Sequence, residues 1–181
     1  VQAVARPEPE PLLGPFAGFC SDSFDFLREL EEKNNTEWMA ANRERYQFVL
    51  REPLVELCDA LAERYVRPVL NREHGWDFEC DSRTGRAVTS ICKNDFGRTG
   101  PYQPVQWVAL YRAARESKRA DAQLFVRVSA DGAKYGFHLG RTARDAGKQF
   151  RRNVQEHAEL FFRALEASGV LRECRFWTGD D

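Results

Sequence analysis

The sequence predicts an α+β domain: helices come first, a mostly antiparallel sheet follows, and a long helix packs on it near the end. Three observations carry this prediction. Residues 21 to 66 repeat apolar side chains at helical spacing, residues 86 to 140 hold four short β-branched and aromatic runs, and residues 142 to 167 return to a helical period. Segregation of helices from strands along a chain is typical of this class.

The chain begins with a Pro-rich stretch, residues 1–18, which we expect to be a linker because it lacks periodicity. We expect one domain over residues 19–178, within a longer protein. Lys and Arg number 27 and Asp and Glu 28, so the net charge of -1 gives no global attraction to nucleic acid. The 5 cysteines are scattered without a CxxC pair, which favours a reducing, cytoplasmic setting and neither disulfides nor a zinc site. No apolar run is long enough for a membrane span, so we expect no membrane contact, and no motif predicts a metal or cofactor.

The first helix is predicted from "SDSFDFLREL", with a cap within residues 21–23 and a stripe of Phe24, Leu27 and Leu30. It should stop before the two asparagines at 34 and 35.

Thr36 is the expected cap of the next helix, on which Trp38, Asn42 and Tyr46 share a face. Pro53 ends or kinks this helix or begins the next one, whose stripe runs to about Val66.

Four runs predict strands: "RAVTSICK", "VQWVALYR", "AQLFVRVS" and "KYGFHLG". The second run also fits a helix. A two-residue turn at Asp131-Gly132 would pair Val128 with Tyr135 and would place Arg127 opposite Gly136. The same turn would pair Val126 with Phe137 and Leu124 with Leu139, and would place Phe125 opposite His138.

A last long helix is predicted from about Thr142 to Ala167, and Gly169 should end it. Its expected buried stripe consists of Phe150, Val154, Phe161, Phe162 and Leu165. "RECRFW" could add an edge strand.

The first candidate site is the polar helix start in "KNNTEWMAANRERY". Its amides and aromatic rings suit a polar, planar ligand, but they also suit the fastening of two helices to a neighbouring loop. The residues are Asn34, Asn35, Trp38, Asn42, Arg43 and Tyr46.

The second candidate site is the Gly-rich loop "SICKNDFGRTGPY", whose glycines would let backbone N–H groups approach an anion. Lys93, Arg98 and Tyr102 are its candidate ligand-binding residues. It lacks the end of a phosphate-binding P-loop, and it also fits an ordinary connection.

The third candidate site is the basic start of the last helix. Cations there oppose the helix dipole, so a bound anion would profit from both the dipole and the side chains. A solvated basic face balanced by Asp145 and Glu156 is the alternative. The anion-binding candidates are Arg141, Arg144, Lys148, Arg151 and Arg152.

Enzyme signatures are missing from the sequence. The 3 histidines stand in no metal-binding spacing, and no GxSxG elbow occurs. His157 is expected to pack beside the last helix, whereas His138, on a strand face with Arg127, is the better functional candidate.

The stretch "FDFLRELEEKNNTEWMAANRERYQFVLREPLVEL", together with "SICKNDFGRTGPY", resembles a family of unknown function, domain family two-four-six-one. Residues 20 to 165 take part, and Met39 stands where the family more often has Phe. The matching positions are Phe26, Leu27, Leu30, Asn34, Asn35, Trp38, Asn42, Arg43, Tyr46, Val49, Pro53, Leu54, Phe96, Arg98, Pro101 and Tyr102.

The resemblance implies an α+β domain without an established reaction. The chain is also similar to versions of this domain fused ahead of AAA-type ATPase modules of the McrB restriction-GTPase kind. In such fusions the front domain is expected to recognise a target while the motor supplies the work.

Three functions stay open. The first is a non-catalytic recognition domain that binds nucleic acid or another polyanion through the basic helix, with Trp38 or Tyr102 stacking a base. The second is a small-ligand or enzyme domain, and the third is a module that docks onto a neighbouring ATPase. The enzyme pocket would be lined by Asn42, Arg43, Lys93, Asp95, Arg98 and His138.

Overall fold

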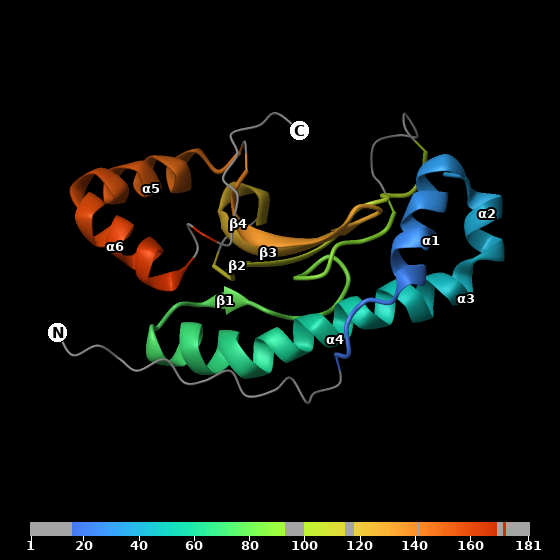
Figure 1. Cartoon of the computed structure of the whole chain (residues 1–181), viewed down its shortest axis with the longest axis horizontal. Helices are drawn as coiled ribbons and strands as arrows, with labels where there is room; N and C mark the ends of the chain where they lie inside the picture. Colours follow the sequence, from blue (N-terminus) through green and yellow to red (C-terminus); the bar gives the residue numbers. More distant parts are fainter. Residues whose placement is uncertain (1–15, 93–99, 115–117, 141, 170–171, 173–181) are drawn as a thin grey trace.

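A computed structural model describes residues 16–92, 100–114, 118–140, 142–169 and 172. It confirms the α+β class: the long helical rod that includes α4 runs along one face of an antiparallel sheet, α1 closes one end, and α5 and α6 lie at the other end (Figure 1). The predicted linker up to residue 15, and all of "RECRFW" except Arg172, lie outside the described residues. The elements in order are α1 (Ser21–Glu32), α2 (Thr36–Ala41), α3 (Arg43–Tyr46), η1 (Gln47–Arg51), α4 (Glu52–Leu61), η2 (Ala62–Glu73), β1 (Phe78–Glu79), β2 (Gln106–Arg112), η3 (Lys118–Ala120), β3 (Ala122–Ser129), β4 (Gly132–Leu139), α5 (Arg144–Glu156) and α6 (Ala158–Ser168).

The helix starts differ from the predicted caps by one residue or more. Cys20 is the N-cap of α1, so residues 21–23 already belong to the helix. Asn35, and not Thr36, caps α2, because its side-chain oxygen accepts the backbone N–H of Trp38. An Asn oxygen satisfies a free N–H of the first turn as well as a Thr hydroxyl does.

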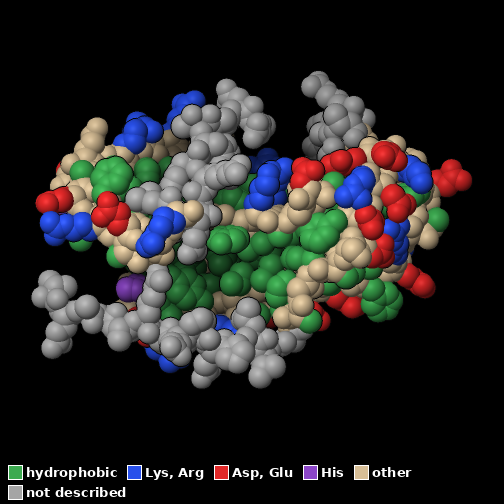
Figure 2. All heavy atoms as spheres, viewed as in Figure 1, with side chains coloured by type: hydrophobic (Ala, Val, Ile, Leu, Met, Phe, Trp, Pro, Cys, Tyr) green, Lys and Arg blue, Asp and Glu red, His purple; other side chains and the backbone are tan. Residues whose placement is uncertain are grey.

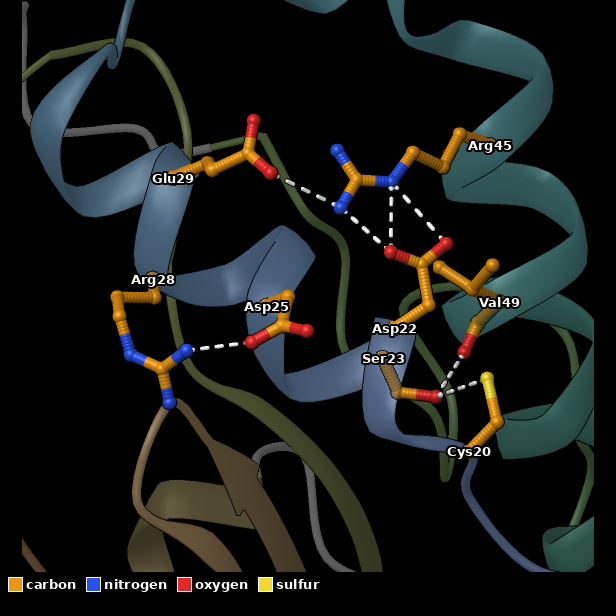
Figure 3. Close-up of polar contacts among 8 residues, drawn as sticks. All are labelled: Cys20, Asp22, Ser23, Asp25, Arg28, Glu29, Arg45 and Val49. Atoms are coloured by element: carbon orange, nitrogen blue, oxygen red, sulfur yellow. Dashed lines mark hydrogen bonds and ion pairs between the residues drawn. The ribbon is translucent and has the colours of Figure 1, made fainter.

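The helix around Pro53 continues without a break, because the backbone changes to π-helical geometry. Pro53 has no N–H for the carbonyl of Val49 four residues earlier. The buried Ser23 hydroxyl donates to that carbonyl at 2.6 Å, and the π-helical segment η1 precedes α4 (Figure 3). A second π-helical segment, η2, carries Pro68 and extends the helix to Glu73, beyond the predicted end at Val66.

The sheet has the order β1-β2-β3-β4, and each neighbouring pair is antiparallel. "VQWVALYR" is therefore a strand and not a helix. The described part of "RAVTSICK" makes only isolated bridges, Val88 to Val108 and to Thr84 and Cys92 to Tyr102, so the predicted full strand is wrong. The very short β1 was not predicted.

The β3–β4 hairpin turns one residue earlier than predicted. Ala130 and Asp131 form the loop, and Gly132, with φ +123°, pairs with Ser129. The observed partner of Val128 is Ala133 and that of Arg127 is Lys134, so every β4 partner is shifted by two residues. A two-residue shift leaves each side chain on its predicted face.

The core lies between one face of the sheet and the helices α1 and α4. Phe26 and Leu54 from the helices and Val108 and Val128 from the strands are all fully buried there. Figure 2 shows hydrophobic side chains also at the surface in the middle of the molecule, whereas charges of both signs gather over α1, α2 and α3 at the right. The core therefore holds the first helices firmly to the sheet.

The predicted last helix is two helices, because the chain turns at His157 between α5 and α6. Phe150 and Phe161 would lie about 16 Å apart along a straight helix. The turn brings their ring centroids to 6.0 Å. His157 is exposed and not packed, and the expected buried stripe is wrong, since Phe162 is 53% exposed. Gly169, with φ +77°, ends α6 as predicted.

Candidate functional site

The asparagine at the end of α1 fastens the helices to the loop that carries Tyr102. Asn34 donates to the Tyr102 carbonyl at 2.8 Å and accepts the Tyr102 N–H at 3.0 Å. A Cβ added to Gly100 would lie 2.5 Å from the Asn34 side chain, so only glycine fits beside it. This contact confirms the interpretation that the amide joins helices to a neighbouring loop.

The other members of the first candidate site also have partners within the chain. Asn35 caps α2, and Asn42 donates to the carbonyl of Trp38 at 2.9 Å. Trp38 and Tyr46 pack against the ring of Phe26, with centroids at 5.3 and 6.0 Å. Burial raises the pKa of the Tyr46 hydroxyl. These side chains serve packing and hydrogen bonding in the fold, and Arg43 beside them is exposed.

An ion-paired cluster that the sequence analysis missed joins α1 to α3. Arg45 donates to both carboxylate oxygens of Asp22, with the shortest contact at 2.6 Å, and to Glu29 at 3.0 Å (Figure 3). These hydrogen bonds lower the pKa of Asp22. No sequence signal links Asp22 to an arginine 23 residues later, because the pairing depends on how α3 folds back.

The basic residues of α5 surround a hollow between that helix and the end of β4. The hollow has a volume of about 300 Å³, and its charged lining residues are Arg144, Lys148 and Arg151. None of the three has an ion-pair partner among the described residues. Arg152 is exposed on the same helix. The structure thus brings together three of the predicted anion-binding side chains, without carboxylates of the described chain to neutralise them.

The predicted enzyme pocket does not assemble from its described members. The hairpin loop contacts α1, since Arg28 donates to the Ala130 carbonyl at 3.4 Å. His138 lies six residues beyond Gly132 on β4, about 20 Å from that end of the sheet. Asn42 lies between α2 and α3 and Arg43 begins α3, near α1, so both are separated from His138. Lys93, Asp95, Arg98 and Arg141 lie outside the described residues.

His138 instead joins an aromatic cluster on the face of the sheet opposite the core. Its ring centroid is 5.9 Å from that of Trp107 and 6.2 Å from that of Phe125, and those two are 4.8 Å apart. The guanidinium of Arg127 lies 6.0 Å from the Trp107 ring. Strand alternation correctly placed Phe125, Arg127 and His138 on one face, but the sequence analysis missed Trp107 because its segment also fitted a helix.

A second hollow, of about 410 Å³, has an acidic lining at the junction of α4, η2 and β1. Its carboxylates are partly used within the chain: Asp81 pairs with Arg83 at 2.5 Å, and Glu79 accepts the Asp81 N–H at 2.9 Å. Among the residues that the structure describes, no three His, Cys, Asp or Glu side chains are placed to hold a metal ion. The four described cysteines are free thiols.

Comparison with known proteins finds a similarity over about a third of the chain. Residues 22–79 match the model of a family described as conserved hypothetical protein (DUF2461). This match agrees with the resemblance in the α1 to β1 region, and it assigns no reaction. Neither the curated proteins nor the solved structures give a match. In the described part of the chain, every helix is too short or too polar to cross a membrane.

Proposed function

We propose that this domain binds nucleic acid through the basic hollow at the start of α5. The observation that carries the proposal is the grouping of Arg144, Lys148 and Arg151 around one hollow of about 300 Å³. Within the described residues these cations have no carboxylate partner, so their charge is available to phosphate groups.

The placement of these cations costs the isolated helix some stability. Positive charge in the first turns opposes the partial positive charge of the helix N-terminus. Only Asp145 offsets it in the first turn of α5. A phosphate in the hollow would interact favourably with both the side chains and the helix end. The surrounding sequence is also basic, since residues 134 to 152 contain six Lys or Arg and one acidic residue.

The experiment is a salt series with a fluorescent 20-nucleotide single strand and the matching duplex, using the whole chain. The triple variant R144A/K148A/R151A should bind at least tenfold more weakly and should show a smaller dependence of log Kd on log salt. The control R64A/R67A/R72A removes the same charge from three exposed arginines of η2 and should bind like the unaltered chain. Equal weakening by both variants, or no binding at low salt, would contradict the proposal.

We further propose that such binding serves an ATPase module in the same polypeptide, in a cytoplasmic setting. The resemblance to domains that precede AAA-type modules supports this part. The reading frame beyond residue 181 tests it directly: an ATPase motif there is the expected outcome, and an unrelated module would contradict it.

A further inference from the structure

We propose that the aromatic face of the sheet stacks the unpaired bases of single-stranded nucleic acid. This inference rests on the proposed function, and it names the kind of nucleic acid. The aromatic face is defined by Trp107 on β2, Phe125 and Arg127 on β3, and Lys134 and His138 on β4.

The strand register explains why these rings meet. Phe125 lies between Ala109 and Gly136, which offer little or no side chain. A Cβ at Gly136 would lie 3.5 Å from the Phe125 ring, so this ring packs beside the β4 backbone at Gly136. Trp107 and His138 both approach this ring, at 4.8 and 6.2 Å between centroids, and lie 5.9 Å from each other, so the three centroids form a compact triangle. Three ring systems from three strands thus form one continuous surface.

The surface stays accessible in the structure. His138 and Lys134 are exposed, and Trp107, Phe125 and Arg127 are only partly buried. The helices α1 and α4 pack on the opposite face, where the core lies.

The charge of this face matches a phosphate backbone. The strands β2, β3 and β4 contain no Asp or Glu at all. Arg127 and Lys134 are directly paired in the register. Among the described residues, the buried Nε of Arg127 has no hydrogen-bond partner, and its guanidinium carbon lies over Trp107 at 6.0 Å. Stacked aromatic rings next to cations are the pattern by which proteins hold single strands.

The aromatic face adjoins the basic hollow through Gly140. A Cβ at Gly140 would lie 3.7 Å from Nε2 of His138, and Gly140 itself lines the hollow. The Thr142 hydroxyl donates to the Arg119 carbonyl, which holds the start of α5 close to the beginning of β3. A strand whose phosphates enter the hollow can therefore place its next bases over His138 and Phe125. Duplex DNA cannot do so, because its bases are paired and stacked on one another.

The test compares three probes on the whole chain: a 12-nucleotide oligo(dT), a 12-base-pair duplex, and inorganic polyphosphate, which has no bases. The variant Trp107→Leu should weaken oligo(dT) binding about tenfold, with the duplex and polyphosphate unchanged. His138→Ala, at an exposed position on the edge strand, should weaken oligo(dT) binding in the same direction and carries little risk of misfolding. The matched control is Trp76→Leu, which removes a half-exposed tryptophan that stacks on His74 elsewhere.

The outcomes separate this inference from the proposed function. If all three probes bind with equal affinity per phosphate and neither Trp107→Leu nor His138→Ala changes oligo(dT) binding, the stacking proposal is overturned. The proposal that the basic hollow binds phosphate groups is then retained. If no probe binds to the unaltered chain at low salt, both proposals fail. Circular dichroism of each variant shows whether the fold is retained. If the Trp107→Leu variant is unfolded, oligo(dT) binding by the His138→Ala variant tests the stacking proposal.

Discussion

The helices at the two ends of this molecule have similar amphipathic sequences, but different kinds of side-chain contact hold them in place. At the amino end, bonds between distant residues join α1 to the following helix, Asp22 to Arg45 and Ser23 to Val49, and join Asn34 to Tyr102 in the loop before β2. At the carboxyl end, α5 and α6 make local side-chain bonds within one helix, such as Glu159 to Arg163 at 2.9 Å. The α5–α6 pair also leaves large apolar side chains such as Leu160 exposed.

This difference teaches that helical periodicity alone does not predict burial. Phe26 and Phe162 both stand on helices with apolar neighbours, yet the first is fully buried and the second is 53% exposed. The bonds between distant residues join α1 to α3, to η1 and to the loop before β2, next to the tightly packed core. The carboxyl end contacts the sheet through Phe137 and Phe150, whose ring centroids are 5.4 Å apart.

The largest expected effect comes from truncating the matched pair of phenylalanines. Phe26→Ala should lower the free energy of unfolding by about 3–5 kcal/mol, because it leaves a cavity beneath Trp38 and Tyr46. Phe162→Ala should change it by less than about 1 kcal/mol, because that ring is already half in water. Chemical denaturation of both variants measures the contrast, and equal losses would show that the carboxyl end is packed as firmly as the amino end.

The class of the fold and most elements were predictable from local patterns. The alternation in "AQLFVRVS" and "KYGFHLG" was enough to pair β3 with β4 and to assign their faces. The loop itself was misplaced by one residue, because Asp131-Gly132 is a favoured turn pair but Gly132 is used at the strand end. The turn at His157 was missed because no Gly or Pro marks it, and only the contact of Phe150 with Phe161 explains it.

The candidate site was predictable only in part. The basic grouping on α5 follows from spacing along one helix, so sequence alone could find it. The aromatic face needs three strands in a known register, and Trp107 meets His138 across 31 residues of chain. Asn34 and Asn42 were conspicuous in the sequence, yet their bonds lie within the protein.

Two glycines sharpen the comparison, because alanine should have opposite effects on stability at the two ends. Gly100→Ala should cost about 2 kcal/mol or more, since φ is +87° and the new Cβ would clash with Asn34. Gly147→Ala within α5 should gain about 0.5–1 kcal/mol, since its Cβ would meet only Arg151, at an ordinary 3.6 Å. Thermal unfolding of the two variants tests the signs, and a loss for Gly147→Ala would reveal packing of α5 that the structure does not show.

The smallest expected effect is the pH dependence of the Asp22–Arg45 ion pair. Because Arg45 lowers the pKa of Asp22 in the folded state, the pair stabilises the protein above the ordinary Asp pKa and loses this contribution as the pH falls through the lowered value. Asp22 is 45% exposed, so water screens the pair and the contribution at neutral pH should stay below about 1 kcal/mol. Asp22→Asn should therefore cost stability at pH 7 and nothing at low pH, as measured by urea unfolding at both. In an Arg45→Gln background the same substitution should have equal effects at the two pH values, and a pH-dependent effect that persists there would assign the shift to a different partner.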